Sequence, residues 1–310
     1  MTEPALHRDI PFATYCDWPG INGDPYRFRD PLHFDACVKG LMPREDSDAM
    51  RFGRGVHCYV LERDEFESRY PIAKPFCTPL KTGENKGKPC GKQGYYRLAW
   101  PDGAGADWFC GVHKVDAADE VKDYATADEV KQYEAIRQAL HRSAFVNQFK
   151  RPGWSEVSGT FTEAGFTLKF RLDRYCEAMK GAKGSSLYAQ AMILDLKKCQ
   201  VGKIDTASCQ KAITNYGYYR KAAVYTIGVE KITGTRPNFA WVFVEDGPPH
   251  DVNVIFADDN DIRIGWGEVT TALQGYRWAL EHNNLYGTMG PKGTDIQRGG
   301  LTEWKLRQNL

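Results

Sequence analysis

Two segments in the middle of the chain alternate apolar and polar residues with the two-residue period of a β-strand. In residues 166–173 every second side chain is a Phe or a Leu, and Asp173 lies on the opposite, polar face. In residues 192–198 the apolar run ends in Asp195 and Lys197, which share one face because strand side chains alternate. An otherwise apolar strand gains little structurally from such a pair, so we expect the pair to serve chemistry.

The periodicity of the remaining chain predicts further helices and strands. A hairpin over residues 154–173 has Glu163-Ala164-Gly165 as its turn, helices are expected over residues 49–66, 127–149, 206–233 and 261–282, and strands over residues 238–244 and 252–256. This order predicts an α/β (α+β) fold in which a mixed central β-sheet is flanked by helices. We expect one domain over residues 1–287, made of an N-terminal helical part (1–150) and a core (151–287), followed by a Gly-rich tail over residues 288–310.

Pairing of the two middle strands would bring Asp173 and Asp195 together. Two carboxylates offer the hard oxygen ligands that Mg²⁺ prefers, and a neighbouring lysine such as Lys197 can orient a water molecule or neutralise developing charge. If both carboxylates bind one ion, they should repel each other when the ion is absent. The spacing is similar to the PD-(D/E)xK nuclease signature, although a solvated edge strand with an ordinary Asp–Lys pair would show the same residues.

The net charge of the chain is too small to attract nucleic acid by itself. Lys and Arg number 41 and Asp and Glu number 40, so any such binding must come from a local patch or groove. The sequence also lacks an apolar run of membrane-spanning length and an N-terminal signal-peptide pattern. We therefore expect a cytoplasmic protein that does not associate with a membrane.

The nine cysteines are scattered and form no Cys-x-x-Cys pattern, which is typical of reduced thiols. Cys77, Cys90, Cys110 and His113 could be drawn as a zinc set, but their irregular spacing favours ordinary loop cysteines. Residues 71–119, which surround them, are rich in Gly, Pro and Lys. That composition fits equally a flexible loop that contacts a phosphate backbone and a solvated insertion.

Several stretches, taken in order and spacing, resemble the catalytic domain of prophage exonuclease VIII (RecE-type). They are Asp9-Ile10-Pro11-Phe12, Gly20-Ile21, residues 49–62, Arg171-Leu172-Asp173, Leu194-Asp195-Leu196-Lys197, Gly234-Thr235-Arg236-Pro237 and Pro248-Pro249. That family belongs to the PD-(D/E)xK superfamily, with lambda exonuclease and the RecB-type nucleases as relatives. The resemblance therefore implies a restriction-endonuclease-like nuclease core.

The resemblance implies a Mg²⁺-dependent exonuclease in which Mn²⁺ can substitute. It would degrade one strand of linear double-stranded DNA from the 5′ end and leave a 3′ overhang. It also implies a closed homo-oligomeric ring and a single-strand annealing protein as partner in recombination. An endonuclease or a repair or defence nuclease of the same superfamily, and a non-catalytic DNA-binding protein on this fold, remain alternatives. Both Asp195 and Lys197 are retained, which favours catalysis.

The resemblance also carries roles to individual positions. Asp173, Asp195 and His57 match the metal site, although His57 by its position alone would be an ordinary histidine at the edge of the core. Lys197 matches the catalytic lysine, and Glu156 an acidic residue before the hairpin. The residues expected to contact DNA are Tyr218, Lys221 and Tyr225, which share one helix face, together with Arg171. Lys221 departs from the family, because a glutamine is usual at that position.

Overall fold

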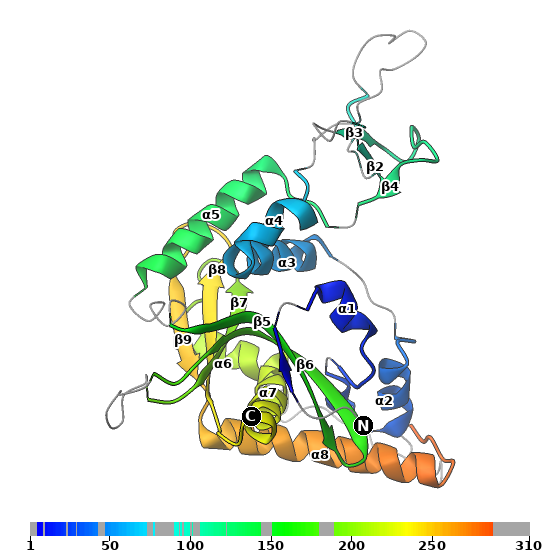
Figure 1. The fold of residues 1–310 in the computed structure, drawn as a ribbon, viewed down its shortest axis with the longest axis vertical. Helices are drawn as coiled ribbons and strands as arrows, with labels where there is room; N and C mark the ends of the chain where they lie inside the picture. Colours follow the sequence, from blue (N-terminus) through cyan, green and yellow to red (C-terminus); the bar gives the residue numbers. More distant parts are fainter. Residues whose placement is uncertain are drawn as a thin grey trace, which may run out of the picture.

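The structure is a computed structural model built around one six-stranded mixed β-sheet (Figure 1). It describes residues 5–8, 10–22, 24–28, 30–42, 47–72, 77, 90–92, 94, 96–99, 101, 106–121, 123–143, 151–179 and 189–287. The strand order is β1 (Leu6–His7), β5 (Gly153–Glu163), β6 (Phe166–Cys176), β7 (Met192–Cys199), β8 (Asn238–Glu245) and β9 (Val252–Phe256). Strands β7 and β8 run parallel, and the other neighbours are antiparallel.

Helices cover both faces of this sheet, which confirms the predicted fold class. The helical segments are α1 (Phe12–Asp17), η1 (Pro25–Arg27), α2 (Pro31–Val38), α3 (Asp48–Leu61), α4 (Arg63–Arg69), α5 (Ala127–Arg142), α6 (Thr206–Asn215), α7 (Tyr218–Thr233) and α8 (Asp259–Glu281). Helices α3, α4 and α5 pack on one face of β7 and β8, and α6, α7 and α8 pack on the other.

The alternation predicted for β7 is confirmed by the two cores. Met192, Leu194 and Leu196 are buried with the α3–α5 layer, whereas Ile193 is buried with the α7–α8 layer. Asp195 follows Ile193 on the latter face. The parallel neighbour β8 has the same alternation, since Ala240 and Trp241 belong to different cores. A strand that is buried on both faces thus ends in a charged pair at its carboxyl end.

Two predicted helices are each broken in the structure. The helix expected over residues 206–233 is divided at Gly217, whose φ of 68° is a left-handed conformation that glycine adopts without steric cost. The helix expected over residues 49–66 ends at Leu61, and α4 starts after Glu62, whose backbone is not helical. Helix α5 ends at Arg142, short of the predicted boundary, and residues 144–150 lie outside the described part. At Glu62 and at Gly217 the helical spacing of apolar residues continues past the interruption, so periodicity alone does not reveal where the helix ends.

The segment between α4 and α5 contains a second, smaller sheet. Strands β2 (Tyr96–Ala99), β3 (Ala106–Phe109) and β4 (Asp119–Glu120) form it in the order β3-β2-β4, away from the main sheet in Figure 1. The described part of this segment is therefore folded rather than a loop throughout. The phosphate contacts expected of this segment depend on a basic cluster, of which Lys92 and Arg97 are described, whereas Lys81, Lys86 and Lys88 lie outside the described residues. The predicted Gly-rich tail also lies outside them.

No helix within the described ranges is both long enough and apolar enough to cross a bilayer.

Candidate functional site

The main sheet opens between β6 and β7, next to the two aspartates singled out in the sequence. The ladder between these strands has three residue pairs, the last being Arg174 with Leu194. The next pair in register would be Asp173 with Asp195, and there the strands separate. The main-chain N–H of Leu196 donates to Asp173 Oδ2 at 2.7 Å, so the carboxylate takes the place of the missing ladder bond. The opening leaves room for side chains of both strands at one point of the sheet.

Strand β5 is distorted at the same level. Its pairing with β6 passes from Ser155–Arg174 to Val157–Leu172 and skips Glu156, whose φ is 53°. A non-glycine residue in the left-handed region costs about 1–3 kcal/mol, and such residues concentrate at functional sites. The register is the same on both sides of Glu156, so this residue lies opposite Asp173, and the kink replaces the main-chain pairing between the two residues.

His57 completes this group from helix α3. Its Nδ1 lies 3.5 Å from Asp173 Oδ2, and the ligand atoms of His57, Glu156 and Asp173 all lie within 4.8 Å of one another. Helix α3 begins at a Ser47 cap and packs closely on α5, because a Cβ at Gly55 would collide with the Tyr133 side chain. The structure thus places His57 beside Glu156 and Asp173.

Asp195 and Lys197 form the second half of the site. The carboxylate of Asp195 is 1% exposed, and the Lys197 ammonium contacts its Oδ2 while Lys221 Nζ lies 3.3 Å from its Oδ1. Burial would raise the pKa of Asp195, but Lys197 and Lys221 outweigh it and lower that pKa to about 2. Conversely, burial lowers the pKa of Lys197 against the opposing effect of Asp195.

The predicted repulsion between Asp173 and Asp195 is not what the structure shows, because the carboxyl group that faces Asp173 is that of Glu156. Two lysines contact Asp195, whereas Glu156 faces Asp173 with Arg171 as its ion-pair partner, and that guanidinium also lies 3.6 Å from Glu62. Burial, followed by the charge of Asp173, raises the pKa of Glu156 to about 7 even though Arg171 opposes the shift. The electrostatic cost of the metal-free site lies on Glu156.

Arg171, which was expected to contact DNA, is buried behind Glu156. Its guanidinium donates to Glu156 Oε2 at 2.6 Å, to Ser158 Oγ at 3.0 Å and to the carbonyl of Ile10 at 2.8 Å. With these partners Arg171 holds Glu156 in place, and its burial leaves little of its side chain exposed. Glu62 Oε1, 3.6 Å from the same guanidinium, is a supporting acid that the sequence reading missed. Both residues belong to segments whose pattern shows only a strand and a helix end.

The donor set fits a hard divalent cation. His57, Glu156 and Asp173 supply one imidazole and two carboxylates, a combination suited to Mn²⁺ and Mg²⁺. Asp195, from β7, is buried, and its Oδ2 lies against the Lys197 ammonium. Asp195 lies outside the tight group of three, so it would serve as a further ligand from the opposite strand.

Two cavities meet at this site. The first, of about 380 Å³, is lined by the acidic group and by Tyr15, Lys221 and Tyr225. The second, a groove of about 790 Å³, is lined by Lys197, Lys198, Lys203, Lys211, Lys221, Tyr216 and Tyr218 among others. Gly53, His57 and Lys221 border both. No acidic residue is among those that line the groove, so a positively charged channel leads to the cavity that contains Glu156 and Asp173.

Comparison with known proteins agrees with this geometry. Residues 29–287 match the family described as PDDEXK-like domain of unknown function (DUF3799), and the chain belongs to that family. Its fold is thus the PD-(D/E)xK nuclease fold that the sequence predicts. No curated protein matches the chain.

The solved structures support the fold independently. The crystal structure of a candidate exonuclease from Eubacterium rectale matches with a TM-score of 0.50 and 16% identity, over 91% of this chain and 87% of that one. A second structure, SSO0001, covers 46% of this chain and 67% of that one at 9% identity, and its TM-score of 0.23 is too low to support an argument. At these identities the first likeness concerns the fold alone.

A variant of His57 tests whether the imidazole belongs to the metal site. We expect His57→Ala to lower DNA hydrolysis strongly at limiting Mg²⁺ and much less at saturating Mg²⁺, because the remaining carboxylates can still bind the ion more weakly. The measurement is the rate of hydrolysis over a Mg²⁺ titration. An equal fractional loss at every concentration would show that His57 acts through packing instead.

Proposed function

We propose that the protein is a divalent-metal-dependent deoxyribonuclease that hydrolyses phosphodiester bonds at the His57–Glu156–Asp173 group. One observation carries the proposal: the sheet opens at Asp173 and Asp195, and a histidine, a kinked glutamate and a lysine converge there. A bound Mg²⁺ or Mn²⁺ ion supplies charge at the scissile phosphate and acidifies a water molecule. The protein's own groups must then position the phosphate and handle the proton.

Lys197 is suited to orient the attacking water. Its ammonium lies against Asp195 and 4.9 Å from the centre of the Tyr218 ring, so it is held at the mouth of the basic groove. Burial lowers its pKa, which makes proton exchange with a neighbouring water easier. Lys221 stays charged, because Asp195 and Tyr225 raise its pKa well above the usual value in spite of burial. We assign Lys197 to the reacting water and Lys221 to the charge of the phosphate.

The basic groove is the proposed path of the DNA strand. Lys203 and Lys211 are exposed along it, and the rings of Tyr216 and Tyr218 lie 5.5 Å apart at its side. A line of cations with aromatic side chains binds a single strand by phosphate contacts and base stacking. Tyr218 and Lys221, which the sequence predicts as DNA contacts, border this groove, whereas Tyr225 lines the acidic pocket. We propose that the scissile strand leaves its duplex and enters the pocket through the groove.

The finer features of the activity rest on the resemblance to exonuclease VIII. We propose that the enzyme degrades linear double-stranded DNA from 5′ to 3′ and leaves 3′ single-stranded overhangs. A homo-oligomeric ring around the DNA would provide processivity, and a single-strand annealing protein would receive the overhang for recombination. The cavity and the groove share Gly53, His57 and Lys221, so a strand that lies in the groove would reach the His57–Glu156–Asp173 group.

A plasmid assay tests the proposed function directly. The protein is incubated with Mg²⁺ and either linear plasmid labelled at one 5′ end or closed circular plasmid. We expect consumption of the linear form alone, with the 5′ label released first as short products. Nicking of the circle would indicate an endonuclease, early loss of a 3′ label would reverse the polarity, and two intact substrates would indicate a DNA-binding protein without catalysis.

The groove gives a separate prediction about binding. We expect the double variant Lys203→Gln/Lys211→Gln to weaken DNA binding at all sequences and to lower the slope of log affinity against log salt by about 1–2, because up to two phosphate contacts are lost. The measurement is fluorescence anisotropy with Ca²⁺ in place of Mg²⁺ over a salt series. A control, Lys131→Gln, removes an exposed lysine of α5 that pairs with Asp128. An unchanged salt slope in the double variant would contradict the proposed path.

A further inference from the structure

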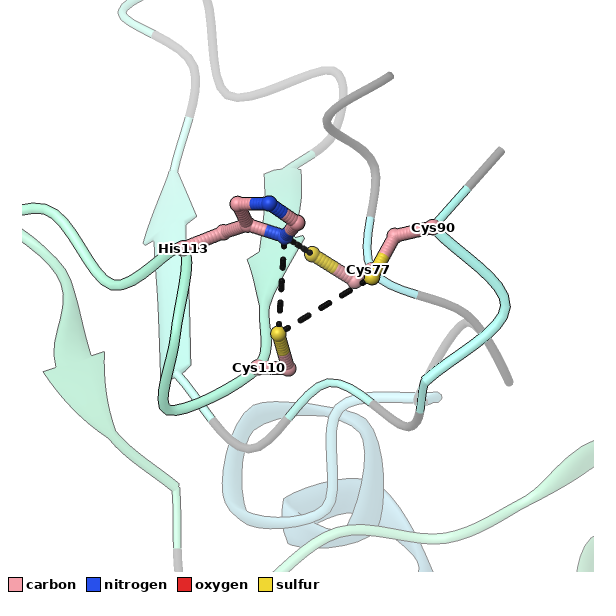
Figure 2. A group of neighbouring side chains, drawn as sticks. All are labelled: Cys77, Cys90, Cys110 and His113. Carbon is pink, nitrogen blue, oxygen red and sulfur yellow. Dashed lines mark hydrogen bonds between the residues drawn. The ribbon is translucent and has the colours of Figure 1, made fainter. Parts of the chain in front are cut away.

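A second cluster of metal-ligand side chains lies outside the nuclease site, beside the small sheet. Figure 2 shows Cys77, Cys90, Cys110 and His113 with their sulfur atoms and the imidazole Nδ1 turned towards one another. One ligand atom from each residue lies within 4.8 Å of the others. The residues come from three separate stretches, and Cys110 and His113 follow strand β3 in one turn. Irregular sequence spacing is thus compatible with convergence in space.

The distances match those of ligands around one tetrahedral ion. Cys77 Sγ and Cys110 Sγ lie 3.4 Å and 3.5 Å from His113 Nδ1, and Cys90 Sγ lies 4.0 Å from Cys110 Sγ. With Zn–S bonds of about 2.3 Å and Zn–N bonds of about 2.0 Å, tetrahedral geometry places two sulfurs about 3.8 Å apart and a sulfur and a nitrogen about 3.5 Å apart. The thiols are free, and the Cys90–Cys110 separation is about twice the length of a disulfide bond.

Burial separates this cluster from ordinary core cysteines. Cys77, Cys90 and Cys110 are 1%, 6% and 3% exposed, and they form a cluster that contains no other buried apolar side chain of the described residues. The neighbouring core is equally small, with Trp108 and Tyr124 buried and Val121 against them. A module with so little apolar burial needs a covalent or metal crosslink for stability.

Main-chain hydrogen bonds fix the positions of the ligand residues. The N–H of His113 donates to the carbonyl of Cys110 at 3.0 Å, which closes the turn that contains two of the four ligands. The N–H of Cys77 donates to the carbonyl of Lys92 at 2.7 Å, which ties two of the three stretches together. Gly91, directly after Cys90, has a φ of 75° and so turns the chain in a way that other residues resist.

We propose that Cys77, Cys90, Cys110 and His113 bind one structural Zn²⁺ ion, which holds the β2-β3-β4 sheet to the two chain stretches that contain Cys77 and Cys90. Three thiolates and an imidazole without a free position are a closed structural set, and the nitrogen ligand favours zinc over an iron–sulfur cluster, which is usually bound by four thiolates. The earlier preference for ordinary loop cysteines is therefore reversed. The inference does not depend on the proposed nuclease activity, since it concerns a separate part of the fold (Figure 1).

The test is the metal content of the purified full chain. We expect about one equivalent of zinc per chain in the wild-type protein after extensive dialysis, measured by elemental mass spectrometry. Cys110→Ser should lose most of it, whereas Cys16→Ser, which makes the same chemical change at an exposed thiol, should retain it. Cys110→His should recover zinc, because it restores a ligand but not a thiol. Equal zinc content in Cys110→Ser and Cys16→Ser would overturn the proposal.

A second measurement uses the wild-type chain and so does not depend on the folding of a variant. Exchange of the bound metal for Co²⁺ should give intense thiolate-to-cobalt absorption together with the visible bands of a tetrahedral ion. Absence of both zinc and these bands would refute the site. Detection of a Cys90–Cys110 disulfide in protein purified without reductant would also refute it, since it would make the cluster a redox pair.

Discussion

Replacing Lys197 with methionine is expected to lower the rate of DNA hydrolysis by about 10²–10⁴-fold while DNA affinity changes little. The methionine keeps most of the side-chain length but can neither orient a water molecule nor exchange a proton. DNA binding should persist, because the remaining lysines of the groove, including Lys203 and Lys211, are untouched. The rate is measured as nucleotide release under Mg²⁺, and the affinity by anisotropy under Ca²⁺.

A matched control separates this effect from a general loss of positive charge. Lys231→Met makes the same change near the C-terminal end of α7, where the lysine pairs with Glu163 at 2.6 Å on the surface. This control should hydrolyse DNA at close to the wild-type rate. Near-normal turnover by Lys197→Met, or a fall in affinity that matches the fall in rate, would remove Lys197 from the catalytic step.

In EDTA, the melting temperatures of Glu156→Gln and Asp195→Asn should shift in opposite directions from that of the wild type. At pH 8 we expect Glu156→Gln to melt above the wild type and Asp195→Asn to melt below it, each by a few degrees. The glutamine removes a charge that burial and Asp173 disfavour, whereas the asparagine leaves Lys197 and Lys221 without their shared carboxylate. Both variants should be strongly impaired in hydrolysis.

The pH dependence follows from the direction of each shift. Glu156 has a folded pKa of about 7 against 4.5 for the ordinary group, so without metal the wild type loses stability as pH rises through that window, by about 3 kcal/mol at most. The advantage of Glu156→Gln should therefore vanish below pH 4.5. Asp195 has a lowered pKa of about 2, so its contribution is present above its usual pKa of 3.8 and is lost as pH falls towards 2.

Metal should stabilise the wild type more than Glu156→Gln. Mg²⁺ binds the folded site, so it should raise the melting temperature of the wild type and raise that of Glu156→Gln much less. Equal metal-induced shifts in both proteins would place the ion elsewhere. A lower melting temperature of Glu156→Gln than of the wild type in EDTA at pH 8 would contradict the assignment of the electrostatic cost to Glu156.

The sequence predicted the central strands because their chemistry is local. Alternation over residues 166–173 and 192–198 depends on the side chains themselves, and it correctly assigned the faces of Ile193 and Leu194. The opening between β6 and β7 is a property of pairing over distance, so no local pattern shows it. The kink at Glu156 could not be predicted either, because a glutamate within a strand pattern does not indicate a positive φ.

The sequence also did not predict the helix interruption at Gly217, the burial of Arg171 or the convergence of the cysteines. Gly217 breaks a helix without a proline, and a glycine inside a helical pattern is tolerated often enough to be ambiguous. Arg171 belongs to the polar face of β6, and only the fold shows that this face at Arg171 is covered by the N-terminal segment rather than by solvent. The Cys77–His113 cluster was set aside because its spacing is irregular, whereas a metal requires proximity in space and not in sequence.

The central claim is that metal at the His57–Glu156–Asp173 group hydrolyses DNA, and one measurement tests it most directly. Wild type and Asp173→Asn are compared for release of nucleotides from linear duplex DNA, each with Mg²⁺ and with EDTA. The account predicts release by the wild type with Mg²⁺ alone, and none above background by the variant. Release by the wild type in EDTA, or undiminished release by Asp173→Asn with Mg²⁺, would contradict it.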